Sequence, residues 1–144
     1  MEHPLSQFKY CPKCGSIHFE INNEKSKRCA DCGFVYYFNP SAATVALIMN
    51  EQNELLVCRR AKDPAKGTLD LPGGFIDMAE TGEEGVRREV KEETGLTLTS
   101  YKLRGLVTFI SDKCEPELMC VFTANEYIGE LTAVSYTHLR AHET

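Results

Sequence analysis

Apolar and polar residues along the chain predict four strands and one helix. The strand candidates are short apolar runs, rich in β-branched and aromatic residues and separated by polar or Gly/Pro-bearing turns. They cover Ser41–Asn50, Glu54–Arg60, Leu96–Ile110 and Glu117–Tyr127. Only the polar turn "NEQN" separates the first two, so we expect them to form a hairpin.

The helix is predicted at Gly82–Thr94. Thr81 and Glu84, three residues apart, have the spacing of a capping box, in which each side chain binds the other residue's backbone N–H group. Gly95 follows the last expected turn, where glycine often ends a helix. Val86 and Val90, one turn apart, supply an apolar stripe along this helix.

Charge is divided unevenly along the chain. Residues 1–40 carry five basic and four acidic side chains, and residues 41–144 carry eleven and seventeen. The acidic excess argues against a nucleic-acid surface on the larger part. The longest apolar run, Ala42–Met49, is far shorter than the roughly 20 residues of a membrane span, so we expect no membrane and a cytoplasmic protein.

Four of the seven cysteines form two C-x-x-C-G knuckles. They are Cys11, Cys14, Cys29 and Cys32. Two such turns can converge four thiolates on one tetrahedral Zn²⁺ ion, although two disulfides or a redox dithiol use the same spacing. We predict a small zinc ribbon at residues 1–38. Because protein would fill all four positions, the ion would be structural, and it would stabilise a unit too small to fold alone.

Three carboxylates of the predicted helix share one face. Glu89, Glu92 and Glu93 are spaced i, i+3 and i+4, and like charges so placed repel each other. Arg88 can offset only part of this charge. A hard cation such as Mg²⁺ or Mn²⁺ would offset the rest, and a solvated charged face is the alternative.

A longer pattern surrounds this helix and resembles the signature box of the Nudix hydrolases without a departure. Nine specified residues over 23 positions carry the match: Gly74, Glu80, Arg88, Glu89, Val90, Glu92, Glu93, Gly95 and Leu96. We refer to Gly74–Leu96 as the box. The resemblance implies an α/β/α sandwich around a mixed sheet, in a domain covering residues 39–133. It also implies an enzyme that hydrolyses a nucleoside diphosphate linked to another moiety, a phosphoric anhydride.

The resemblance also implies roles for individual residues. Divalent-metal ligands would be Glu89, Glu92, Glu93 and the carbonyl of Gly73, with Glu80 and Arg88 orienting them. The general base stays open among Glu92, Glu93, Glu115 and Glu117. The resemblance implies a small nucleotide as the substrate. A homodimer is one possible oligomeric state.

A zinc ribbon before the box is similar to the NADH pyrophosphatase subgroup. That group carries a Ser-Gln-Pro-Trp element after the box, but the stretch here is "KLRGLVTFISDKCEPE" and the chain has no tryptophan. The proline typical of ADP-ribose hydrolases is expected about fifteen residues after the box, but Ser111 lies near that position and Pro116 comes later. The identity of the substrate therefore stays open. The alternative function is a binding module, in which the ribbon docks nucleic acid or protein and the Nudix half is a scaffold.

The last eleven residues, Val134–Thr144 ("VSYTHLRAHET"), resemble the translation of a transposase adapter used in preparing DNA libraries. All eleven agree with one reading frame of that adapter. We therefore expect a non-native tail and assign its histidines no function. We also expect the Nudix fold to be incomplete at its C-terminus, with part of one sheet face uncovered.

Overall fold

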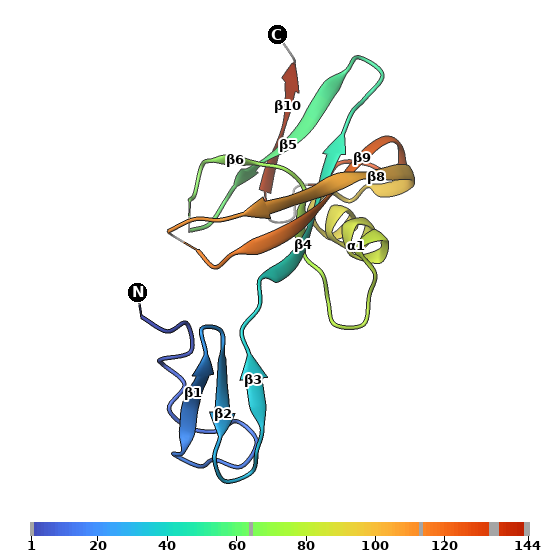
Figure 1. Cartoon of the computed structure of the whole chain (residues 1–144). Helices are drawn as coiled ribbons and strands as arrows, with labels where there is room; N and C mark the ends of the chain where they lie inside the picture. The colour runs from blue at the N-terminus through green and yellow to red at the C-terminus, as the bar shows by residue number, and fades with distance from the viewer. Residues whose placement is uncertain (1, 64, 113, 133–135, 143–144) are drawn as a thin grey trace. The chain divides into compact units, whose positions relative to one another are not determined.

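The computed structural model places the chain in two units, Met1–Pro40 and Ser41–Thr144 (Figure 1). It describes residues 2–63, 65–112, 114–132 and 136–142, the last range as backbone only. Of the predicted non-native tail, Val134, Ser135, Glu143 and Thr144 lie outside the described residues. The origin of the tail therefore stays a prediction. No helix among the described residues has the length and apolar character needed to cross a membrane.

The first unit is a three-stranded antiparallel sheet. Its strands are β1 (Phe19–Asn23), β2 (Ser26–Cys29) and β3 (Val35–Tyr37), in that order. Its buried cluster holds Cys11, Phe19 and Cys29, with Phe34 packed against them. So small an apolar core leaves the cysteines central to stability, because a unit of this size buries too little surface to fold on apolar contacts alone.

The second unit is built on a mixed four-stranded sheet in the order β7-β4-β9-β8. Its strands are β7 (Gly73–Phe75), β4 (Ser41–Ile48), β9 (Glu117–Ile128) and β8 (Thr97–Phe109). β4 runs parallel to β9 and antiparallel to β7. The strands predicted for β4, β8 and β9 are confirmed, whereas no strand is predicted at β7. The continuous apolar run of β4 suits a central strand with neighbours on both edges.

The predicted hairpin of β4 with β5 (Glu54–Arg60) forms only at its turn. β5 instead pairs with β6 (Leu69–Asp70) and β10 (Tyr136–His142) in a second, antiparallel sheet. An isolated bridge between Met49 and Leu55 joins the segments at their turn. β9 pairs with β4 along Ser41–Ile48 and β7 pairs with it along Ala43–Val45, so little of either edge of β4 is left for β5.

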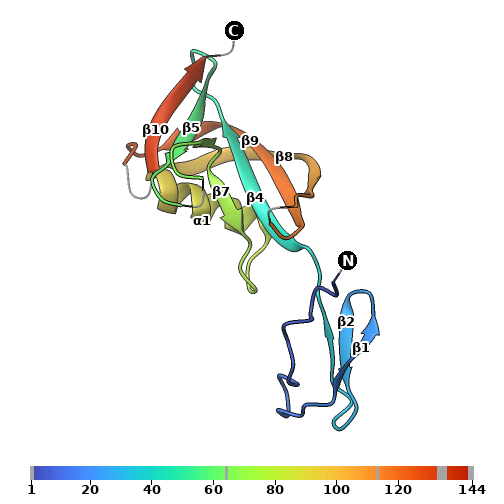
Figure 2. The same ribbon diagram turned by 90° about the vertical axis from the view of Figure 1, so that its left-hand side faces the viewer.

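The predicted helix is confirmed as α1 (Gly82–Thr94), which lies against one face of the four-stranded sheet (Figure 2). Its capping box is present: Glu84 N–H donates to Thr81 Oγ1 at 3.2 Å, and Thr81 N–H donates to Glu84 Oε2 at 2.7 Å. Gly95 ends the helix at φ 78°.

The main core joins the helix to both sheets. Its buried members are Ala46, Ile48, Leu56, Val86, Val90, Leu96, Leu98, Phe122 and Ala124. α1 is the single helix in the described part of the chain, and it covers one sheet face. The far end of β8 is open to solvent, because Leu106, Val107 and Phe109 are exposed.

Candidate active site and metal centres

Two consecutive glycines bring β7 into direct contact with α1 and β4. A Cβ atom on Gly74 would lie 2.6 Å from Cδ of Glu89 and 2.7 Å from both its carboxylate oxygens, so this carboxylate rests on the bare backbone. Gly73 donates its N–H to Glu93 Oε2 at 3.0 Å. Gly73 itself has φ 155°, and a side chain there would collide with the carbonyl of Thr44. The glycines therefore let two carboxylates of the box helix reach the strand.

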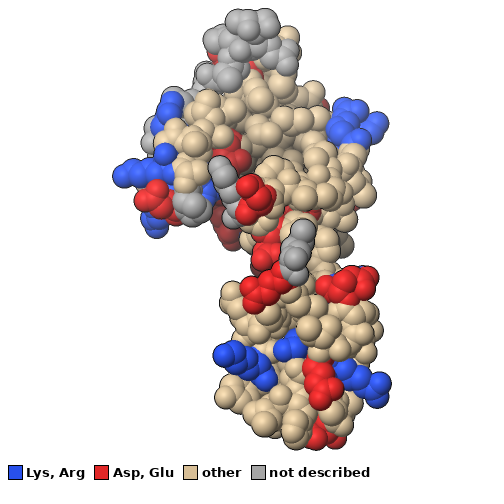
Figure 3. Space-filling view, turned by 60° about the vertical axis from the view of Figure 1, so that its left-hand side comes forward, with Lys and Arg blue, Asp and Glu red and all other residues tan. Residues whose placement is uncertain are grey.

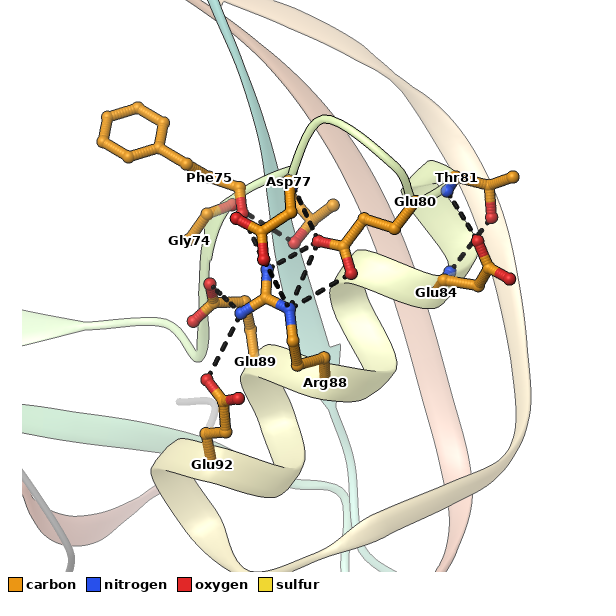
Figure 4. Close-up of polar contacts among 10 residues, drawn as sticks. Gly74, Phe75, Asp77, Glu80, Thr81, Glu84, Arg88, Glu89 and Glu92 are labelled. Carbon is orange, nitrogen blue, oxygen red and sulfur yellow. Dashed lines mark hydrogen bonds and ion pairs between the residues drawn. The ribbon is translucent and has the colours of Figure 1, made fainter.

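Arg88 is the cationic centre of the cluster (Figure 4). Its guanidinium donates to Glu80 Oε1 at 2.6 Å and to Glu80 Oε2 at 3.1 Å. It also donates to Glu89 Oε1 at 2.7 Å and to Glu92 Oε2 at 3.2 Å. A further N–H binds the carbonyl of Phe75 at 2.9 Å, which ties the guanidinium to β7. One side chain thus links the loop, the strand and the helix.

These contacts hold Glu80 in its ionised form. The hydrogen bond from Arg88 places the pKa of Glu80 below its ordinary value, and the N–H of Asp77 adds to the effect. Hydrogen bonds to Glu80, the larger cause, and to Glu89 raise the pKa of Arg88. Glu80 is therefore a fixed anion at neutral pH, suited to orienting Arg88 rather than to exchanging protons.

The donor set fits a hard divalent cation. Glu89 and Glu93 approach β7, and Glu92 lies one turn from Arg88 with its side chain 60% exposed. Carboxylate oxygens are the donors that Mg²⁺ and Mn²⁺ prefer, and Arg88 offsets only part of the three negative charges. The other two base candidates lie apart in sequence: Glu115 is in the β8–β9 connection and Glu117 begins β9. Within the described residues, neither has a described hydrogen bond to α1.

Sequence reasoning missed two partners of Arg88. The Phe75 carbonyl is a backbone atom, so no residue type marks it. Asp77 lies 3.6 Å from Arg88 Nε and falls among the five unspecified positions between Gly74 and Glu80. Its only signal in the sequence is an acidic residue in a loop of the box.

The four knuckle cysteines converge as predicted. Their Sγ atoms all lie within 4.8 Å of one another. The separations are 3.7 Å for Cys11–Cys32 and 3.6 Å for Cys14–Cys29. A tetrahedron with Zn–S bonds of about 2.3 Å has sulfur separations of about 3.8 Å, so the geometry fits zinc. These distances are far beyond a disulfide bond of about 2.05 Å, and the disulfide alternative is not seen.

Backbone groups of the second knuckle favour a thiolate. N–H groups of Cys32 and Asp31 bind the sulfur of Cys29, the first being the larger cause, and lower its pKa to about 7. A lowered thiol pKa favours metal binding, because the ligand is the thiolate.

Several curated proteins have sequences similar to that of this chain. The NAD-capped RNA hydrolase NudC of Vibrio vulnificus is 28% identical over 131 residues, covering 90% of this chain and 48% of that protein. The ADP-ribose pyrophosphatase of Methanocaldococcus jannaschii is 38% identical over 100 residues, covering 67% of this chain and 57% of that protein. The chain spans about half the length of the curated relatives it matches.

Solved structures share the fold. The MutT NUDIX hydrolase from Burkholderia pseudomallei superposes with a TM-score of 0.66 at 28% identity, covering 72% of this chain and 84% of that one. The NUDIX domain matches residues 39–141, well over half of the chain. On this match, with the box glutamates and their arginine assembled between β7 and α1, the chain belongs to the NUDIX domain family, that of the Nudix hydrolases.

Proposed function

We propose that this chain hydrolyses a phosphoric anhydride in a nucleoside diphosphate linked to another moiety, using Mg²⁺ or Mn²⁺. One observation carries the proposal: Glu89 and Glu93 meet the backbone of β7, while Arg88 holds Glu89 and Glu92. On a solvated charged helix face, the carboxylates would extend into water rather than contact the backbone of a strand.

The box residues would each do a different part of the work. Glu89, Glu92 and Glu93, with the carbonyl of Gly73, would hold the divalent cation, which neutralises the pyrophosphate and lowers the pKa of an attacking water. Arg88 keeps Glu89 and Glu92 in place, and Glu80 anchors Arg88. The base that takes the proton from water is one of Glu92, Glu93, Glu115 and Glu117.

The substrate class follows from the relatives' names and stays a proposal. NAD-linked and ADP-ribose compounds share one unit, an adenosine diphosphate joined to a second group. RNA capped with NAD is a third candidate. Acidic and basic side chains are mixed over the surface that Figure 3 displays, so charge alone supports no nucleic-acid footprint on that face. We therefore put the small nucleotides first.

The test is product release from a substrate panel in Mg²⁺ or Mn²⁺. The panel comprises ADP-ribose, NADH, an NAD-capped oligonucleotide, a diadenosine polyphosphate, a sugar nucleotide and a nucleoside triphosphate. We expect metal-dependent cleavage of at least one diphosphate-linked member. Lack of turnover on every member by folded, metal-supplied protein would instead favour the binding module.

For the first unit we propose a structural zinc ion bound by the four knuckle cysteines. The sulfur separations support it, and with all four positions filled by protein the ion has no open site for chemistry. Cysteines that form no disulfide and are available to zinc suit a reducing compartment, so we propose a cytoplasmic location. Metal analysis of the purified chain should find one zinc per chain.

A further inference from the structure

Three side chains connect the two knuckles outside the sulfur cluster. Ser16 and His18 follow the first knuckle, Cys11–Gly15, and Asp31 lies inside the second, Cys29–Gly33. Ser16 Oγ donates to Asp31 Oδ2. His18 Nδ1 lies 3.0 Å from Asp31 Oδ2 and 3.3 Å from Oδ1. One carboxylate of the second knuckle therefore binds two residues that follow the first.

The same residues flank the sulfur ligands in the chain. Ser16 comes directly after the first knuckle, and Asp31 lies between Cys29 and Cys32. The hydrogen bond between Ser16 and Asp31 therefore ties together the two segments that carry the four cysteines. Hydrogen bonds around metal ligands fix ligand orientation at many sites.

The contacts of Asp31 with Ser16 and His18 lie in the segments next to the two exposed cysteines. Cys11 and Cys29 are buried, whereas Cys14 and Cys32 are exposed. Asp31 immediately precedes Cys32, and Ser16 is two residues beyond Cys14. A chelator can first reach the exposed thiolates, and the two knuckles must separate before the ion leaves.

A catalytic triad does not explain the cluster. Ser16 donates to the carboxylate and has no described hydrogen bond to the ring of His18, so that ring is not placed to activate the hydroxyl. The side chains of His18 and Asp31 are 59% and 54% exposed, which leaves no enclosed place for a substrate. Exposed pairs add little to overall stability, so a local role is the better explanation.

We propose that Asp31, with Ser16 and His18, forms a clasp that holds the two knuckles together and slows the release of zinc. This inference rests on the proposed zinc site. It makes Asp31 a positioning residue, acting through the segments that carry Cys14 and Cys32 rather than by binding the ion. The clasp is suited to this small unit, because few apolar contacts tie its knuckles together.

The test measures zinc release from the full chain into excess chelator containing a colorimetric zinc indicator. Asp31→Ala should accelerate release by about tenfold, the lower end of the effect of removing hydrogen bonds around metal ligands. Glu24→Ala is the matched control, since it removes the same charge from an exposed turn of the same unit. Its release rate should stay within about twofold of wild type.

Ser16→Ala tests the same contact from its other side, and it serves as the test if the Asp31 variant does not fold. It removes one hydroxyl and should accelerate release by a smaller factor. Combining it with Asp31→Ala should change the rate by less than the product of the two single effects, because both act through one contact. Equal release from wild type, Asp31→Ala and Ser16→Ala would overturn the clasp alone. A folded wild-type chain that takes up no zinc would overturn the zinc site and the clasp together.

Discussion

At the residue scale, Gly74 governs where Glu89 can lie. Its missing side chain leaves the space that the Glu89 carboxylate occupies, and Gly74 is not in the left-handed backbone region. The obstacle to a larger residue is therefore the end of a flexible side chain rather than the backbone. A methyl group there would displace the carboxylate and leave the strand intact.

We predict that Gly74→Ala weakens metal binding and lowers turnover while its unfolding midpoint changes little. The displaced Glu89 can no longer join the other box glutamates, so the affinity for Mn²⁺ should fall by about tenfold or more. Metal titration followed by calorimetry measures the affinity. Gly105→Ala is the control, because nothing lies within 4 Å of its added Cβ. Unchanged metal affinity in Gly74→Ala would show that Glu89 is not a ligand.

Glu93 provides a second residue-scale prediction. Glu93→Gln removes a charge at nearly constant shape and should lower kcat on the order of a thousandfold, since a bound metal supplies several kcal/mol to the transition state. Glu83→Gln, in the exposed first turn of the same helix, should stay close to wild type. Turnover by Glu93→Gln within tenfold of wild type would make the ligand assignment wrong.

At the element scale, α1 must begin at a defined residue for its glutamates to face β7. The reciprocal bonds between Thr81 and Glu84 set that start, and Gly95 sets the end through its N–H bond to the Lys91 carbonyl at 3.0 Å. Val86 and Val90 then bury one side of the helix. The direction of the metal-binding face follows from these local features.

We therefore predict that Thr81→Ala lowers the free energy of unfolding by about 1 kcal/mol, because it leaves the N–H of Glu84 without its cap. Denaturant unfolding monitored by circular dichroism measures the change. Thr81→Ser keeps the hydroxyl and should recover most of the loss. If the alanine and serine variants were equally stable, the cap would contribute nothing measurable.

At the scale of the whole molecule, the two units should depend on different metals. Cys29→Ser should abolish zinc binding and unfold residues 1–40, because the cysteines occupy the centre of a small core. The box helix has its own core in the second unit and should stay folded. Amide hydrogen exchange resolved by segment would show the difference, with protection lost in β1 to β3 and retained in α1. Loss of protection in α1 as well would mean that the units fold together.

The sequence alone determined the features that depend on neighbouring residues. The helix with its caps, the positions of β4, β5, β8 and β9, the two knuckles and the face shared by Glu89, Glu92 and Glu93 all follow from spacings of a few residues. Local spacing can specify them because helix and strand periods, and the reach of a short turn, are set by the backbone.

Only the tertiary structure decided which distant segments meet. β5 joined a second sheet and meets the β4 segment only at their turn, while β7 and the far strand β9 pair with β4. The anchor of Arg88 on the Phe75 carbonyl and the clasp of Asp31 on Ser16 likewise arise where separate segments approach. Such contacts depend on strand pairing and close packing across the fold, which no local pattern in the chain specifies.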